Sequence, residues 1–261
     1  HRCCRRQRQM CIRDREIHDL EKFHNKHYTN EKICIAIAGN LSEEIYKIFE
    51  KSDLSGIKES PNLPNLQNTP SLKIRNGRES VKFDNLEFSR IFMAWFIPNL
   101  NDQKNIIGLE ILASILSVGR NSRLVKILKE DSNLVESVYV DVNAGELGGL
   151  FIMEASCESK DIDLVEKQIN KTIDEISNCK VLALDEIKKA INIVKSNYIF
   201  NLETSTQLSS FFGNELLWGR KSSINNLESH LKYWNDLDNF KEITEYIRGE
   251  KFTLVASPGK C

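Results

Sequence analysis

The chain has 261 residues, of which 41% are hydrophobic and 28% are charged, as in an ordinary folded protein of one or two domains. Its net charge is −1, and its sequence holds no run near the roughly eighteen uncharged apolar residues of a membrane span. Composition therefore argues against a membrane-spanning helix and against a basic surface for nucleic acid.

The first fifteen residues differ from the rest of the chain. They contain six arginines and one aspartate, so residues 1–15 carry +5 and the remainder carries −6. They lack the apolar core of a secretory signal, and their paired cysteines and absence of serine argue against a transit peptide. The codons CAG-ATG-TGT-ATA-AGA-GAC encode Gln9 to Asp14 and resemble a transposase adaptor used in sequencing libraries. We therefore expect a non-native leader, with the native reading frame continuing upstream.

The next stretch is predicted to form a helix, a strand and a second helix. Residues 16–28 have apolar side chains on one side of a helix. Residues 32–39 are short and continuously apolar, which is typical of a strand buried inside a sheet. A cap at Asn40 or Ser42 is expected to start helix 41–51. This order indicates the closing piece of an α/β unit.

A linker is predicted after this unit. Residues 57–79 contain three prolines among asparagine, serine and glycine, which favours an extended connection between domains. The linker would separate residues 16–56 from a second domain at residues 80–261.

The second domain is expected to begin with a short strand at 81–83 and a clear strand at 88–97, which Pro98 ends. Asp102 can start a long helix whose apolar residues form a face wide enough to be buried. Gly119 is a natural stop, because glycine can adopt the left-handed conformation that closes a helix.

The spacing of the apolar residues changes after Gly119. Asn121 or Ser122 is predicted to cap a short helix that carries Leu124 and Leu128, and valines then alternate with polar residues over strand 136–144. The later expected elements are strand 150–156, helices 161–177, 185–218 (with a break near Gly213), 223–234 and 240–247, and strand 252–256. The fold class predicted from these elements is α+β, an antiparallel-rich sheet layered with helices.

The segment around Gly119 also resembles a known family. Residues 119–124, 128–130 and 134–138 resemble the non-catalytic domain of the pitrilysin/insulinase zinc metallopeptidases, which include the mitochondrial processing peptidases and their bacterial relatives. The resemblance implies that residues 80–261 are this non-catalytic domain. It also implies that residues 16–56 are the C-terminal tail of a zinc-type domain, a partial domain of the same type.

The family holds zinc with an inverted His-x-x-Glu-His motif and a distant glutamate, and this motif is absent from the sequence. His24 and His27 lie three apart on one helix, but neither has a glutamate at the required offset, so packing or surface roles are favoured. His18 and His230 have no partners at ligand spacing. We expect zinc in the intact protein, no zinc bound by this chain, and no catalytic residue within it.

A second family site is an Arg and Tyr pair that holds the substrate backbone. The resemblance places Lys129 at the arginine position and Glu136 at the tyrosine position. Lysine lacks the planar fork of arginine, and glutamate reverses the hydrogen-bonding character of tyrosine. The chain therefore resembles the domain that follows the zinc domain in the same polypeptide, which does not use the pair.

Four residues are candidates for contact with a substrate chamber, namely Arg120, Arg123, Lys129 and Glu136. For the two arginines a structural role at the glycine corner is favoured, because the last carbonyls of a helix need donors. Glu110, inside the apolar helix, is expected to be exposed or paired rather than catalytic.

Four of the seven cysteines lie outside the suspected leader, and none forms a C-x-x-C pair. Cys34 and Cys157 fall in apolar strand patterns. The favoured interpretation is that they are small buried residues in a reducing compartment, such as a bacterial cytoplasm.

The resemblance implies part of a zinc-dependent metalloendopeptidase, in which this segment encloses a peptide substrate and an upstream zinc domain activates water. Expected partners are the peptide, that zinc domain and a further subunit in a homo- or heterodimer. The alternative is a metal-free scaffold or substrate-binding subunit that pairs with a separate catalytic chain. An unrelated α+β domain would be favoured if strands 88–97, 136–144 and 150–156 did not share one sheet.

Overall fold

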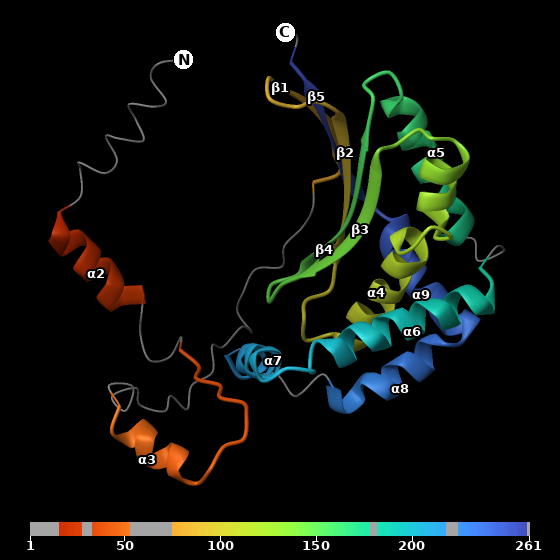
Figure 1. Cartoon of the computed structure of the whole chain (residues 1–261). Helices are drawn as coiled ribbons and strands as arrows, with labels where there is room; N and C mark the ends of the chain where they lie inside the picture. Colours follow the sequence, from red (N-terminus) through yellow and green to blue (C-terminus); the bar gives the residue numbers. More distant parts are fainter. Residues whose placement is uncertain (1–15, 28–32, 53–74, 178–181, 218–223, 260–261) are drawn as a thin grey trace. The chain divides into compact units, whose positions relative to one another are not determined.

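The computed structural model describes residues 16–27, 33–52, 75–177, 182–217 and 224–259 (Figure 1). The suspected leader at residues 1–15 and most of the predicted linker at 57–79 lie outside these ranges, as do Cys179 and Cys261. The chain divides into two compact units. One unit joins His1–Asn65 with Leu202–Lys221, and the other joins Leu66–Asn201 with Ser222–Cys261.

The larger unit is built on one five-stranded sheet with the strand order β1-β5-β2-β4-β3. The strands are β1 (Gly77–Phe83), β2 (Ser89–Ile97), β3 (Ser137–Ala144), β4 (Gly149–Cys157) and β5 (Lys251–Pro258). Only β1 and β5 pair in parallel, and the other three pairings are antiparallel. The predicted α+β fold with an antiparallel-rich sheet is confirmed, and the three strands that could have argued for an unrelated domain share this sheet.

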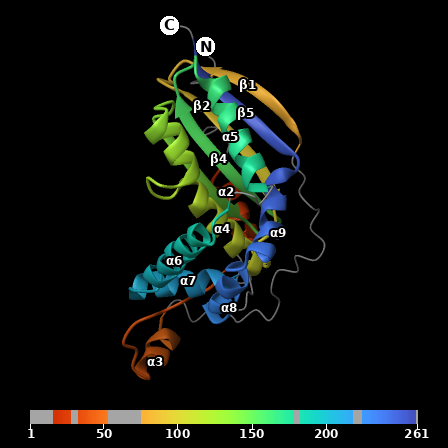
Figure 2. The ribbon, with the colours of Figure 1, turned by 90° about the vertical axis from the view of Figure 1, so that its right-hand side faces the viewer.

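Helices cover one face of this sheet, as Figures 1 and 2 show. The covering helices are α4 (Gln103–Ser117), α5 (Ile162–Ser177) and α9 (Leu237–Arg248), with α6 (Leu184–Phe200) and α8 (Ile224–Trp234) packed around α4. Alternate side chains of β2 point into this layer, and Ile91, Met93, Trp95 and Ile97 are all at most 1% exposed. This alternation is why the sequence of β2 forms a strand with one fully buried face.

The long helix α4 lies at the centre of the unit. The Asp102 side chain caps it by accepting a hydrogen bond from the Asn105 backbone N–H, as the sequence predicts. Ten of its fifteen residues are buried, so it is covered nearly all round rather than along one stripe. Gly119 follows with φ 87°, the left-handed conformation expected of a helix stop.

The short helix after Gly119 differs from the prediction. Residues Val125–Asp131 form a π-helix, η4, whose N-cap position is Leu124. Neither Asn121 nor Ser122 caps it. The Ser122 hydroxyl instead donates to the Gly119 carbonyl oxygen at 2.7 Å, which closes the glycine corner, so the predicted cap is wrong. A serine hydroxyl often caps a helix, but the Ser122 hydroxyl stabilises the turn that precedes η4.

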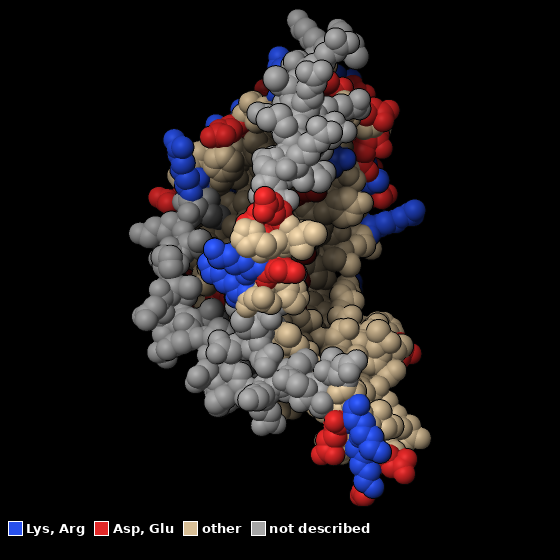
Figure 3. Space-filling model, turned by 90° about the vertical axis from the view of Figure 1, so that its left-hand side faces the viewer, with Lys and Arg blue, Asp and Glu red and all other residues tan. Residues whose placement is uncertain are grey.

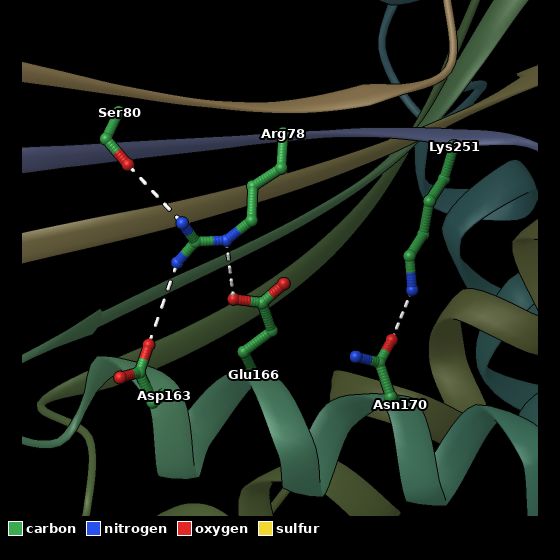
Figure 4. Close-up of polar contacts among 6 residues, drawn as sticks. All are labelled: Arg78, Ser80, Asp163, Glu166, Asn170 and Lys251. Carbon is green, nitrogen blue, oxygen red and sulfur yellow. Dashed lines mark hydrogen bonds and ion pairs between the residues drawn. The ribbon is translucent and has the colours of Figure 1, made fainter.

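Charged side chains attach α5 to the edge of the sheet (Figure 4). The Arg78 guanidinium on β1 contacts two carboxylates of α5, with Nε 3.1 Å from Glu166 and Nη2 3.7 Å from Asp163. Lys251 on β5 donates to the side-chain amide oxygen of Asn170. Burial lowers the pKa of Lys251, although the nearby carboxylates oppose that shift. These contacts fix an amphipathic helix whose apolar side is buried as predicted.

The described residues of the smaller unit form three helices, α2 (Ile17–His27), α3 (Glu44–Glu50) and α7 (Ser205–Leu217). The predicted buried strand at 32–39 is wrong for its described part, because residues 33–38 have no strand structure and Ile37 is 50% exposed. A buried strand needs hydrogen-bonded neighbours, and no described segment pairs with these residues. Helix α3 begins after Glu43 with no side-chain cap, rather than at Asn40 or Ser42.

The predicted single helix over 185–218 is two helices, with the break at residues 201–204 and not near Gly213. Thr204 explains the break, because its hydroxyl accepts from the Gln207 backbone N–H while Gln207 accepts from the Thr204 backbone N–H. This reciprocal capping box starts α7. Gly213 lies inside α7, where an added Cβ would be 3.1 Å from the Cβ of Ala36. Gly213 therefore permits a close approach to residues 33–38 within the smaller unit.

Candidate functional site

The site candidates from the sequence lie on the segment that joins α4 to β3. This segment consists of the Gly119 corner, the π-helix η4 and a turn at Asn133, which has φ 49°. The Leu134 backbone N–H donates to the Leu128 carbonyl oxygen at 2.8 Å and closes the end of η4. Two tight corners thus fix the path of the segment on either side of η4.

Arg123 is engaged inside the protein. Its guanidinium makes two hydrogen bonds to the Glu186 carboxylate in the first turn of α6, at 3.1 Å from Nε and 2.7 Å from Nη2. The arginine side chain is only 13% exposed. This geometry supports the structural role favoured from the sequence. Arg120, by contrast, is exposed beside Gly119.

Lys129 and Glu136 are brought together, but not as an ion pair. The Lys129 ammonium donates to the Glu136 backbone carbonyl oxygen at 2.6 Å, and the Glu136 backbone N–H donates to the Ser156 carbonyl oxygen at 2.8 Å. The Glu136 residue is exposed. The structure therefore joins Lys129 to Glu136 and joins Arg123 to α6, so the four candidates do not converge on one cluster.

Glu110 is paired, as expected, but its surroundings make it chemically unusual. It is half-buried on α4 and hydrogen-bonded to the Tyr198 side chain of α6. Burial raises the pKa of Glu110 to about 7, the hydrogen bond from Tyr198 opposes that shift, and the negative charge of Asp141 adds to it. The only sequence signal was a lone acidic residue inside an otherwise apolar helix.

A second hydroxyl links α4 to the edge of the sheet. Ser117 Oγ accepts a hydrogen bond of 3.0 Å from the Val140 backbone N–H, which faces away from β4. It also donates to the Ala113 carbonyl oxygen at 3.3 Å. The last turn of α4 thereby covers part of the outer edge of β3, which would otherwise offer unpaired backbone groups.

The described residues do not fit a zinc site, because they contain no group of three or more His, Cys, Asp or Glu side chains that could hold a metal ion. His24 is exposed on α2, the His18 ring lies 3.6 Å from Asp19, and the His27 side chain lies outside the described residues. His230 is half-buried on α8, where burial and the charge of Lys104 lower its pKa.

Two surface properties bear on the partner predictions. In the part of the chain that the structure describes, no helix is both long and apolar enough to cross a lipid bilayer. The face of the molecule in Figure 3 carries basic and acidic side chains side by side over its described residues, rather than a continuous basic patch. A phosphate backbone is not the natural partner of this face.

Two curated relatives of the chain are named as uncharacterized zinc proteases. A protein from Streptomyces coelicolor named as a zinc protease is 25% identical over 80% of this chain and 46% of its own length. The zinc protease YmxG of Bacillus subtilis is 21% identical over 90% of this chain and 56% of its own length. The chain thus spans about half the length of the curated relatives it matches.

Solved structures confirm the fold. A protease from Helicobacter pylori superimposes with a TM-score of 0.71 at 16% identity, over 85% of this chain and 54% of that one. Among family models, the one described as the peptidase M16 inactive domain matches residues 16–194, which is more than half of the chain. The chain therefore belongs to the M16 family of pitrilysin/insulinase-type zinc metallopeptidases, and it carries the inactive domain of that family.

Proposed function

We propose that this chain is the non-catalytic part of a zinc-dependent metalloendopeptidase, in which it forms one wall of a chamber that encloses a peptide substrate. One observation carries the proposal. The chain matches the inactive domain of the family and spans about half the length of relatives named as zinc proteases. The other half of such a protein would supply the metal and the general base that hydrolysis needs.

The domain assignment is part of this proposal. Residues 16–56 are the C-terminal tail of the zinc-type domain, residues 57–79 are the linker, and residues 80–261 are the non-catalytic domain. Zinc then belongs to the intact protein and is held by the preceding domain. Further partners are the peptide substrate and a second subunit in a homo- or heterodimer.

Among the four chamber candidates, Arg120 and Glu136 are the residues that we propose to face substrate. Both are exposed on the segment between α4 and β3. Arg123 and Lys129 are less suited, because their charged groups already bind Glu186 and the Glu136 carbonyl oxygen. The guanidinium of Arg120 would favour acidic side chains of a peptide, and the carboxylate of Glu136 would favour basic ones.

The decisive experiment is to sequence the gene upstream of the codon for Glu16 and to express the complete reading frame beside residues 16–261. An in-frame His-x-x-Glu-His motif is expected, together with cleavage of quenched fluorescent peptides that a zinc chelator abolishes. A Glu→Gln change in that motif should abolish cleavage as well. Residues 16–261 alone are expected to be inert.

Two outcomes would contradict the proposal. Turnover by residues 16–261 with stoichiometric zinc at His18, His24 or His27 would make this chain itself the catalyst. An upstream sequence without the motif would support the alternative, a metal-free scaffold or substrate-binding subunit that pairs with a separate catalytic chain.

A further inference from the structure

A groove of about 660 Å³ lies between α6 and α8, away from the segment between α4 and β3. The two helices lie side by side and run in opposite directions, because the chain leaves along α6 and returns along α8 (Figure 1). Its lining residues are Lys188, Ile191, Asn192 and Lys195 from α6, and Glu228, Ser229, Leu231, Lys232 and Asn235 from α8. These positions repeat every three or four residues, so each set forms one face of its helix.

The two ends of the groove differ in charge. At one end the Lys195 ammonium pairs with the Glu228 carboxylate at 2.5 Å. Because the helices are antiparallel, Lys188 and Lys232 both lie toward the other end, one on each wall. Among the described residues, neither of these two lysines forms an ion pair. The groove therefore has one end with a paired lysine and one end with two lysines that form no ion pair, and its lining carries three lysines and one glutamate.

The floor of the groove is apolar. Leu231 is 3% exposed and Ile191 is half-buried beside it. Asn192 and Asn235 flank the floor with amide groups, which can both donate and accept hydrogen bonds. A complementary ligand needs an apolar group that packs on the floor and carboxylates that pair with the two lysines. It also needs peptide groups that hydrogen-bond to the two side-chain amides.

We propose that the groove between α6 and α8 binds an acidic amphipathic segment of a partner protein, with an apolar side chain on Ile191 and Leu231 and carboxylates at Lys188 and Lys232. The charge complementarity at the lysine end carries this inference. It does not depend on the peptidase function, since it uses none of the residues assigned to the chamber. A helix with one apolar face bordered by acidic residues would satisfy both requirements.

A nucleic acid fits the groove less well. Its phosphates would meet the Glu228 carboxylate at one end, and its sugars would leave the apolar floor without a matching group. Binding of an oligonucleotide is therefore the competing outcome of the test.

The test uses the full chain and two fluorescent twelve-residue peptides, one of alternating leucine and glutamate pairs and one with glutamine in place of each glutamate. The glutamate peptide should bind at least tenfold more tightly than the glutamine peptide, and its affinity should fall as salt is raised. The variant with Lys188→Glu and Lys232→Glu should lose at least tenfold in affinity. A matched control with Lys82→Glu and Lys189→Glu makes the same charge change at exposed lysines outside the groove and should bind within twofold of the wild type.

A second measurement does not depend on variants. The acidic peptide should slow chemical acetylation of Lys188 and Lys232, read by mass spectrometry, and leave Lys82 and Lys189 unchanged. Equal loss of affinity in the groove and control variants would overturn the proposal. Equal binding of the two peptides, or tighter binding of an oligonucleotide that the groove variant abolishes, would overturn it too.

Discussion

Arg123 and Glu186 form a two-point bridge between the segment after Gly119 and the first turn of α6, with hydrogen bonds of 3.1 and 2.7 Å. Glu186 also accepts from the Ala183 backbone N–H at 3.1 Å, so one carboxylate holds both the partner segment and the start of its own helix. Burial opposes ionisation of Glu186, but the bonds from Arg123 and Ala183 outweigh it and lower its pKa. The bridge therefore works best with an ionised carboxylate.

The first prediction concerns the planar fork of Arg123. Arg123→Lys keeps the charge but loses one of the two bonds, and should cost about 1 kcal/mol of unfolding free energy in urea melts at neutral pH. Because the pKa of Glu186 is lowered in the folded state, this stability is present above the ordinary carboxyl pKa and disappears as pH falls through the folded value. A second variant, Arg123→Met, removes both hydrogen bonds, and its unfolding free energy should approach that of the wild type in acid. A difference in unfolding free energy that stays constant on acidification would refute the ion pair.

The second prediction concerns Glu110. The pKa of Glu110 is raised to about 7 from 4.5, so the folded protein binds this proton more tightly than the unfolded chain does. The contribution to stability is complete below pH 4.5 and is lost as pH rises through about 7, on the order of 3 kcal/mol in all. Glu110→Gln should remove this slope and be more stable than the wild type at about pH 8.

The measurement is the difference in unfolding free energy between Glu110→Gln and the wild type, recorded from acid to neutral pH. Glu130→Gln makes the same change at an exposed carboxylate on η4 and is the matched control. A flat difference for Glu110→Gln would show that the carboxylate titrates as if in water.

The third prediction is that Gly108→Ala destabilises the protein, although alanine normally improves a helix by about 0.5–1 kcal/mol. An added Cβ would lie 2.6 Å from Ile243 and 2.8 Å from Trp234, whose side chain is fully buried. We expect a loss of about 1–3 kcal/mol from this overpacking. Gly249→Ala, where nothing lies within 4 Å, should change stability by less than about 0.5 kcal/mol. A stabilised Gly108→Ala variant would mean that α4 and α9 pack more loosely.

The fourth prediction tests the central helix directly. Leu112 is 0% exposed on α4, so Leu112→Ala should cost about 2–5 kcal/mol in urea melts. Leu164→Ala removes the same atoms at a position that is 43% exposed on α5, and should cost less than about 1 kcal/mol. If Leu112→Ala lowers the unfolding free energy by less than about 0.5 kcal/mol, the placement of α4 on the sheet is contradicted.

Elements with a strong period were predictable from the sequence. The apolar positions of α5 from Ile162 to Ile176 are buried as expected, because a helix of that length shows its buried stripe in the spacing alone. The strand predicted at 32–39 is absent from residues 33–38, because strand structure depends on neighbours that a local pattern does not reveal. The break before α7 did have a signal in the sequence, because Thr204 and Gln207 have the spacing of a capping box. The prediction placed the break at Gly213 instead, since glycine often ends a helix.

The site was only partly predictable for a related reason. The likeness around Gly119 placed Lys129 and Glu136 at the positions of the family's arginine and tyrosine, but it could not show that the lysine binds the backbone carbonyl oxygen of Glu136. The pKa of Glu110 is raised by its burial and by the charge of Asp141, and neither can be seen in the residues next to it in sequence. The lysines of the α6–α8 groove are ordinary surface residues in the sequence, and only the antiparallel return of the chain brings them to one groove.

The position of β5 has a consequence for synthesis. It follows every described helix of its unit, yet it lies between β1 and β2 in the sheet. As the chain leaves the ribosome, β1 and β2 emerge long before β5 and cannot be joined until it arrives. A ribosome that stalls before Lys251 would release a nascent chain in which β1 has no strand to pair with. Chaperones therefore have most to protect in this protein just before translation of β5.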